Sequence, residues 1–496
     1  MTMTSTFTRR TFLGGLGVVA ATTALAGCAT GPFAATRIMP TDALIAQYEA
    51  KRATSGRTVA QALTAEKFSA EIAGTNVQTW AYNGALTGPT IRAQAGDLLS
   101  VQLKNSLSEA TSIHWHGLAL RNNADGVPDV TQQAVAAGAE YDYSFLAPDP
   151  GTYWYHSHVE MQRERALYGA LIVEDPKEPL SYDREWVVIL DDWVDGMPGT
   201  PDELLSSISG MSGMNMGDGS GMLMGSSSEY LGGDAGDVKI PVHLFNGKSA
   251  DAPDQFEAKR GDHIRLRIIN AAGDTAYRIG LQGQQITLTH ADGFAVQQVD
   301  VDAVVVGMGE RIDALITVTQ DQTALFALAE GKGGGALGII SADGTFGGPP
   351  PLPAKLEGTV TDGGKLRAHE SVLLPAREVD RVIDMQLTGG MMMYDWGING
   401  RQFDATAPFD GAFDIRLNER VRVNINNTTL MWHPMHLHGH TFQLDNDGAR
   451  KDTVIVRPGQ IVSFEFDADN PGQWLTHCHN AYHAARGMMG VFSYVR

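Results

Sequence analysis

Three segments of the chain alternate between apolar and polar residues, and each ends in asparagine. They are residues 96–105, 261–270 and 418–427, with the sequences GDLLSVQLKN, GDHIRLRIIN and NERVRVNINN. A period of two is typical of a β-strand, because successive side chains point to opposite faces of the sheet. Three such strands at similar intervals predict three similar β-domains.

A second repeat links the first and the third of these regions. Residues 150–158, PGTYWYHSH, align without gaps on residues 471–479, PGQWLTHCH. Both read as a Pro-Gly turn that leads into a strand with a pair of histidines. The middle region has no such pair near the matching place.

The rest of the chain consists of short strand-like segments between Gly and Pro turns, which is typical of β-sandwiches and barrels. We therefore predict an all-β fold, and the length of 496 residues suits about three domains. The expected domains are residues 28–178, 179–355 and 356–496. Linkers are expected near Pro176 and in the Pro-rich stretch 347–353.

Residues 1–27 read as an export signal. Arg9 and Arg10 precede an apolar run over residues 12–25, which is typical of twin-arginine signals and too short to cross a membrane. Residues 25–28, LAGC, resemble the lipobox of bacterial lipoproteins, whose cysteine is lipidated and becomes the first mature residue. We therefore expect a protein of the periplasm or cell envelope, anchored by a lipid on Cys28. The alternative is cleavage nearby, with Cys28 discarded.

Composition and charge narrow the function. Apolar residues make up 43% of the chain, enough to bury cores, and no segment after the N-terminus is apolar for long enough to span a bilayer. The formal net charge of -20 argues against nucleic-acid binding and favours attraction of cations. Only two cysteines exist, Cys28 and Cys478, so Cys478 is either a metal ligand or an inert buried thiol.

Histidines supply the strongest chemical signal, because ten of the 15 fall into four groups. The groups are His114 with His116, His156 with His158, His433 with His436 and His438, and His477 with His479 and His483. On a strand, a His-x-His pair puts both imidazoles on one face, about 7 Å apart, so that each can bind a different metal ion. One such pair is weak evidence, since buried histidines are often hydrogen-bonded core residues. Four groups are hard to explain by packing. The other five, His243, His263, His290, His369 and His440, are expected to be solvated or core side chains.

Cys478 lies within the last group of histidines and indicates which metal that group binds. Imidazole suits copper, and a cysteine thiolate beside two histidines and a weak methionine is the signature of a blue-copper site. His483 and Met488 follow Cys478 at suitable positions. Because side chains alternate on a strand, Cys478 points away from His477 and His479. A copper ion on Cys478 would thus be connected through a few covalent bonds to ions on the two flanking histidines.

These motifs resemble the four copper motifs of the three-domain multicopper oxidases, the family of laccases, ascorbate oxidase and bacterial cuprous oxidases. The resemblance covers nearly all of the mature chain and implies three consecutive cupredoxin-like Greek-key β-sandwich or barrel domains with four copper ions. The implied ligands are His433, Cys478, His483 and axial Met488 for type 1 copper, His114 and His436 for type 2 copper, and His116, His156, His158, His438, His477 and His479 for the type 3 pair. The first and third domains supply these last eight histidines equally, so we expect the cluster at their interface, where copper would also clamp the domains together.

The resemblance also implies a mechanism. A substrate gives single electrons to the type 1 copper at Cys478, and the strand carries them to the other three ions, where O₂ takes up four electrons and four protons. Asp125 resembles the family's acidic residue near type 2 copper and is a candidate proton relay. The alternative is that Asp125 and Gly126 only form a turn. Some bacterial members carry a glutamate directly after the last ligand histidine; this chain has Ala484, which leaves the proton donor on the type 3 side open.

A methionine-rich segment suggests the reductant. In residues 211–224, five methionines are interspersed with Gly, Ser and Asp, and this segment is expected to form a mobile loop. The methionines are Met211, Met214, Met216, Met222 and Met224. Thioethers select Cu(I), and such loops resemble those of bacterial copper-resistance oxidases, which oxidise Cu(I) to Cu(II). The alternative is a flexible linker.

A docking site for Cu(I) near type 1 copper could use Met431, close to His433, together with Asp395 or a neighbouring methionine such as Met391. For Met392 we expect core packing. The competing functions are a broad laccase for phenols or other organic reductants, a non-enzymatic cupredoxin scaffold, and a copper nitrite reductase. Scaffold relatives lose ligands, and nitrite reductases lack the eight histidines. We therefore expect a monomeric oxidase whose partners are O₂ and a small reductant, Cu(I) or a phenol.

Overall fold

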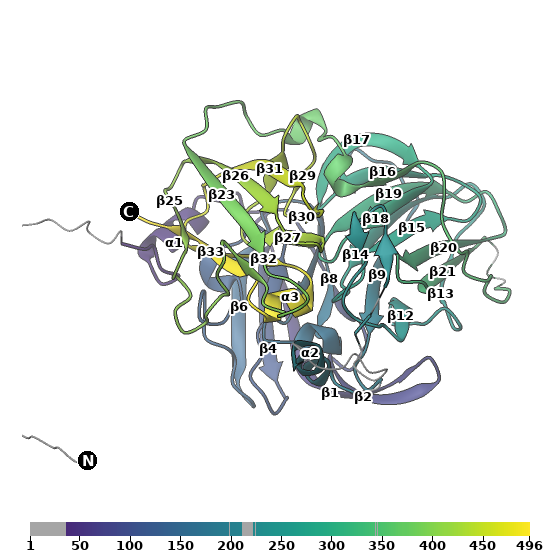
Figure 1. Cartoon of the computed structure of the whole chain (residues 1–496). Helices are drawn as coiled ribbons and strands as arrows, with labels where there is room; N and C mark the ends of the chain where they lie inside the picture. The colour runs from purple at the N-terminus through teal and green to yellow at the C-terminus, as the bar shows by residue number, and fades with distance from the viewer. Residues whose placement is uncertain (1–35, 198, 211–221, 224, 343, 345) are drawn as a thin grey trace, which may run out of the picture. The chain divides into compact units, whose positions relative to one another are not determined.

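The computed structural model describes residues 36–197, 199–210, 222, 223, 225–342, 344 and 346–496 (Figure 1). The expected export signal at residues 1–27, Cys28, Met211, Met214, Met216 and Met224 lie outside these residues. Within the described part of the chain, no helix combines the length and the apolar character needed to cross a membrane.

The first eight strands form two four-stranded sheets, with the orders β2-β1-β4-β6 and β3-β8-β7-β5 (purple to blue in Figure 1). Their bounds are β1 (Thr58–Ile72), β2 (Thr75–Tyr82), β3 (Gly88–Gln94), β4 (Leu98–Asn105), β5 (His114–His116), β6 (Glu140–Leu146), β7 (Gly151–His156) and β8 (Tyr168–Glu174). Helix α1 (Ala43–Glu49) precedes them, and the short 3-10 helices η1 (Asn122–Ala124) and η2 (Gln162–Arg165) lie between strands.

The middle strands form two six-stranded sheets, β12-β9-β14-β19-β16-β17 and β13-β21-β20-β15-β18-β22, and the small pair β10-β11. Their bounds are β9 (Arg184–Trp193), β10 (Ser227–Ser228), β11 (Gly233–Asp234), β12 (Val242–Phe245), β13 (Asp254–Glu257), β14 (His263–Asn270), β15 (Tyr277–Leu281), β16 (Ile286–Ala291), β17 (Phe294–Val301), β18 (Ala303–Val306), β19 (Arg311–Thr317), β20 (Gln322–Ala329), β21 (Gly335–Ser341) and β22 (Val360–Asp362), with helix α2 (Pro201–Gly210) after β9. Because β22 pairs with β18, this sheet continues past residue 355, where the sequence placed the end of the second domain.

The last strands form a six-stranded sheet, β24-β23-β26-β31-β28-β29, and a five-stranded sheet, β25-β33-β32-β27-β30. Their bounds are β23 (Arg381–Thr388), β24 (Gly397–Ile398), β25 (Phe413–Ile415), β26 (Arg420–Asn427), β27 (His433–Leu437), β28 (Phe442–Leu444), β29 (Arg450–Lys451), β30 (Thr453–Val456), β31 (Ile461–Asp467), β32 (Gln473–Cys478) and β33 (Met489–Tyr494). The 3-10 helices η3 (Gly363–Lys365) and η4 (Glu370–Val372) precede them, and helix α3 (Ala481–Ala485) follows β32.

The three alternating segments form β4, β14 and β26, as predicted. Each of these strands runs parallel to one neighbour and antiparallel to the other. The terminal residues Asn105, Asn270 and Asn427 are fully buried and repeat one pattern: the amide nitrogen donates to two backbone carbonyls, and the amide oxygen accepts a backbone N–H. The repeated asparagine thus satisfies buried backbone groups of the loop that follows each strand.

One contiguous apolar core joins strands β1–β8 to strands β23–β33. It contains Trp115 and Leu120 from the first group and Trp474 and Phe492 from the last, all fully buried. Strands β9–β22 contribute most of a separate core. The strands that carry the paired histidines therefore belong to the two groups that share a core.

Candidate metal centre

Two matching pairs of antiparallel strands position most of the clustered histidines. Strand β5 pairs with β7 so that His114 lies opposite His156. Strand β27 pairs with β32 so that His436 lies opposite His477. The gapless repeat in the sequence therefore supplies one strand of each pair, β7 and β32, once in each group of strands that shares the core.

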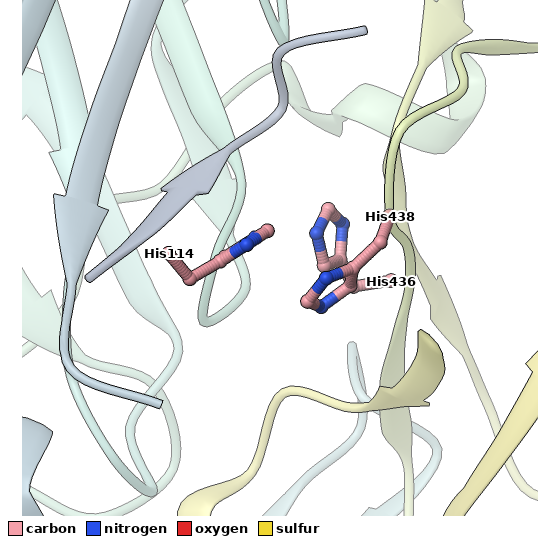
Figure 2. A group of neighbouring side chains, drawn as sticks. All are labelled: His114, His436 and His438. Carbon is pink, nitrogen blue, oxygen red and sulfur yellow. The ribbon is translucent and has the colours of Figure 1, made fainter. Parts of the chain in front are cut away.

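Eight imidazoles gather in one buried cluster: His114, His116, His156, His158, His436, His438, His477 and His479. The rings of His114 and His438 stack with their centroids 3.8 Å apart, and so do those of His116 and His436. Figure 2 shows His114 facing His436 and His438 from a different strand. Each stacked pair joins one histidine from β1–β8 to one from β23–β33, so the cluster lies between these groups.

The ring nitrogens of the cluster form groups of three that are close enough together to bind one metal ion. One nitrogen each of His114, His436 and His438 lies within 4.8 Å of the others, and the same holds for His158, His438 and His477. The Nε2 atoms of His438 and His477 are 3.1 Å apart. His438 thus connects two groups of nitrogens.

The remaining three histidines, His116, His156 and His479, also lie close together. Their neutral rings and the unpaired nitrogens of the cluster are suited to binding metal ions. The rings of His116, His156 and His479 lie 4.9 to 5.8 Å apart, and burial, with neighbouring charges, lowers the pKa of all three well below the usual range. Nδ1 of His116 and Nε2 of His114, His156 and His436 have no hydrogen-bond partner among the described residues. Neutral imidazoles with unpaired buried nitrogens are costly unless an ion uses the lone pairs, and imidazole suits copper.

A separate candidate metal site surrounds Cys478, the free cysteine of the described chain. Its Sγ atom lies 3.6 Å from Nδ1 of His433 and from Nδ1 of His483, and these two nitrogens are 3.0 Å apart. Met488 is fully buried, and its carbonyl accepts a hydrogen bond from the Cys478 N–H at 3.0 Å. A thiolate with two imidazoles and a methionine nearby is the donor set of a blue-copper site.

The two sites share strand β32 and the residue that follows it. Cys478 Sγ faces His433 and His483, whereas the rings of His477 and His479 lie in the eight-histidine cluster. This alternation is the one expected for a strand. Three consecutive residues therefore connect the two sites covalently.

Asp125 lies fully buried beside the cluster. Its Oδ2 is 3.0 Å from Nδ1 of His438, and its backbone oxygen is 2.9 Å from Nδ1 of His114. Gly126 has φ of 82°, and a Cβ there would lie 1.7 Å from the Ile113 carbonyl oxygen, so a tight turn is also present. The turn and the contact with the cluster occur together; the proton relay at Asp125 stays a prediction.

Asp452 is a second buried carboxylate at the cluster, and the sequence analysis missed it. Its Oδ1 lies 3.2 Å from Nε2 of His116 and 3.4 Å from Nδ1 of His436, and Arg311 donates two hydrogen bonds to it at 2.6 and 2.7 Å. Although burial opposes ionisation, Arg311 holds the pKa of Asp452 well below its usual range. The ionised carboxylate can therefore orient both imidazoles. Its place follows from the pairing of β27 with β30, which puts His436 opposite Thr453 and has no local sequence signal.

Asp237 plays the corresponding part at the second site, and it was also missed. Its Oδ2 lies 2.9 Å from Nε2 of His483, and the Tyr394 hydroxyl donates to the same oxygen at 2.6 Å. A carboxylate on the outer nitrogen of a ligand histidine fixes the orientation of the ring. Here it leaves Nδ1 of His483 facing Cys478. Asp237 belongs to the middle group of strands, so only the tertiary structure reveals its role.

The methionines proposed to bind Cu(I) differ in exposure. Met431 is 2% exposed, Met391 is half-buried and Asp395 is exposed. The expectation that Met392 packs in the core is wrong, because its side chain is 87% exposed. It lies in the turn between β23 and β24, where Tyr394 takes the inward position instead.

Comparison with known proteins identifies the family of the chain. Three family models described as multicopper oxidase match residues 64–178, 184–343 and 377–495. The chain is similar to multicopper oxidase MmcO of Mycobacterium tuberculosis, with 42% identity over 99% of this chain and 97% of that protein. It is 27% identical to copper resistance protein A of Escherichia coli, over 86% of this chain and 91% of the relative. The crystal structure of laccase from Botrytis aclada superposes with a TM-score of 0.74 and 24% identity, covering 90% of this chain and 89% of the laccase. The predicted fold of three consecutive cupredoxin-like β-domains is confirmed.

Proposed function

The chain belongs to the multicopper oxidase family, whose members are copper oxidoreductases that use O₂, and we propose that it couples the one-electron oxidation of Cu(I) to the four-electron reduction of O₂ to water. Bound copper would supply the redox chemistry, since it takes up single electrons and passes them to O₂. The observation that carries the proposal is the direct connection of the Cys478 site to a cluster of eight histidines.

We assign four copper ions to these donors. The proposed ligands are His433, Cys478, His483 and Met488 for type 1 copper, His114 and His436 for type 2 copper, and His116, His156, His479, His158, His438 and His477 for the type 3 pair. The grouping of the ring nitrogens supports one set of three for the pair, His158, His438 and His477, and it places His116 and His156 together with His114. The unpaired buried nitrogens support metal binding as such.

The residues around the cluster provide for electrons and protons. In the proposal, electrons would pass from Cys478 along the backbone to the imidazoles of His477 and His479, which lie on the opposite face of the strand. Asp125, whose Oδ2 lies 3.0 Å from Nδ1 of His438, would relay protons toward the cluster. Burial of the cluster keeps bulk water away and strengthens these electrostatic interactions.

The described end of the methionine-rich segment supports Cu(I) as the reductant, because it lies beside a type 1 ligand. Met222 forms a β-bridge with Val238, and the Leu223 N–H donates to the Asp237 carbonyl at 2.8 Å. The side chain of Asp237 in turn contacts His483. Met222 and Leu223, the described end of this segment, are therefore linked by backbone contacts to the residue that contacts His483.

A second segment brings soft ligands to the same place. The rings of Tyr394 and Trp396 lie 6.4 and 4.2 Å from that of His483, while Met392 and Met393 between β23 and β24 are 87% and 61% exposed. Exposed thioethers on a segment packed against the type 1 site suit Cu(I), and the net charge of -20 attracts cations. The likeness to copper resistance protein A points the same way.

Replacing Met211, Met214, Met216 and Met224 by leucine is expected to lower kcat/KM for Cu(I) about tenfold and to leave that for a phenol unchanged. Leucine keeps the apolar bulk and removes only the soft sulfur ligand. Oxygen uptake by the copper-loaded protein, driven by each donor in turn, measures both values. Unchanged Cu(I) oxidation would contradict the copper-specific function and favour a broad laccase.

We also propose that residues 1–27 direct export by the twin-arginine route, that Cys28 carries a lipid in the cell envelope, and that the enzyme acts as a monomer. The sequence motifs alone support the first two statements. Radiolabelled fatty acid should label the wild-type protein and not Cys28→Ala. Label that persists in this variant would exclude the lipid on Cys28.

A further inference from the structure

One side of the histidine cluster opens on a cavity of about 100 Å³. His158 and His477 line it together with the exposed Glu160. A volume of this size has room for on the order of three water molecules. The cavity is therefore suited to bring protons from solvent to His158 and His477 of the cluster.

The helix that follows the last ligand strand offers no acid to this cavity. Ala481 and Ala484 of α3 line it with methyl groups. A chain of waters that delivers protons benefits from a carboxyl group that can release and take up a proton. The acid must therefore come from another element.

Glu164 of η2 lines the same cavity and is 3% exposed. Its Oε1 makes no hydrogen bond to any described residue and lies 3.5 Å from Nε of Arg163. Its other oxygen packs against Gly273, where a Cβ would approach it to 1.9 Å, so only a glycine leaves room for the carboxyl group. A buried carboxyl group beside a cavity, with an oxygen that accepts no hydrogen bond, is unexpected unless it serves a function.

The surroundings of Glu164 favour its neutral, proton-carrying form. Burial raises the pKa of its carboxyl well above the usual range; Arg163 opposes the rise, and Asp192, Asp191 and Asp274 add to it. A charge on Glu164 would also raise the pKa of three buried tyrosines, Tyr168, Tyr277 and Tyr482. This direction of the Glu164 pKa shift favours the protonated carboxyl group, which is the form that can donate a proton.

We infer that Glu164 is the proton-relay residue for the side of the cluster formed by His156, His158 and His477. The inference rests on the proposed function as an oxidase with a three-copper cluster. Reduction of one O₂ consumes four electrons from the donor and four protons and yields two waters. In each relay step the Glu164 carboxyl loses its O–H proton through the cavity, becomes a carboxylate, and regains a proton from solvent past Glu160.

A purely structural role makes a different prediction. Arg163 lies 2.9 Å from Nδ1 of His479 and its other guanidinium nitrogen donates to the His479 carbonyl at 3.2 Å. If Glu164 only balanced the charge of Arg163, its loss would disturb copper binding at His479. A proton relay, in contrast, can be removed with copper still bound.

The test compares copper-loaded wild type, Glu164→Gln, and Glu164→Gln combined with Ala484→Glu. Glutamine keeps the size of the side chain and removes the ionisable proton, and Ala484→Glu returns a carboxyl group to the same cavity. Glu378→Gln is the matched control, because Glu378 is exposed and does not line the cavity. Copper content, oxygen uptake over a range of pH, and the infrared carbonyl band of a neutral carboxyl group are measured for each.

We expect Glu164→Gln to lose about 10²-fold in kcat, to keep its copper, and to lose the infrared band, with Ala484→Glu restoring kcat to within about tenfold of wild type. Unchanged kcat in Glu164→Gln, or copper that falls in step with kcat without rescue by Ala484→Glu, overturns the inference. A wild-type protein that binds copper and takes up no O₂ would instead refute the proposed function.

Discussion

Replacing Cys478 by serine is expected to abolish oxygen uptake driven by either Cu(I) or a phenol. The hydroxyl group supplies no thiolate at neutral pH, so the type 1 ion loses the ligand that lies 3.6 Å from both His433 and His483. It also removes the sulfur through which the proposed electron path enters β32. Oxygen uptake should fall to the level of copper-free protein, and the intense thiolate-to-copper absorption should disappear.

Met488→Leu is the matched control for this variant. It removes the proposed weak axial ligand and keeps the thiolate and both imidazoles. In blue-copper sites the axial ligand tunes the reduction potential, so we expect the absorption band to remain and the potential to change. A Cys478→Ser protein that still reduces O₂ at the wild-type rate would show that electrons do not pass through this residue.

Copper removal is expected to cause the second large effect, a loss of at least about 4 kcal/mol in the free energy of unfolding. A single ligand present at about 1,000 times its Kd stabilises the folded state by that amount. The eight imidazoles come from β1–β8 and from β23–β33, so ions bound among them would hold these two groups together. Calorimetric unfolding of copper-loaded and chelator-treated protein measures the loss.

The stability of Cys478→Ser distinguishes this linkage between the two groups of strands from a general stabilising effect of metal binding. The donors of the type 1 site, Cys478, His433 and His483, all belong to the last group of strands or to helix α3 between β32 and β33. Loss of that ion alone should therefore cost much less stability than full removal of copper. An equal loss in both cases, or no loss on chelation, would contradict this linkage.

Much of the fold was predictable because its signals are local. Alternation over residues 418–427 follows directly from a strand with one buried face, and it predicted β26 together with β4 and β14. The membership of each sheet was less accessible, since β22 joins the sheet of β18 by a pairing that no local pattern predicts. Met392 was misjudged for a similar reason: in the turn between β23 and β24, the inward position goes to Tyr394.

The sequence by itself determined which donors lie on which face of β32. The alternation of side chains along a strand puts Cys478 on one side and His477 and His479 on the other, independently of the rest of the fold. Only the tertiary structure decided which buried carboxylates orient these ligands, because Asp452 and Asp237 reach them through strand pairing and packing between distant parts of the chain. Spacing along a strand is a property of the backbone, whereas contacts across sheets depend on the whole fold.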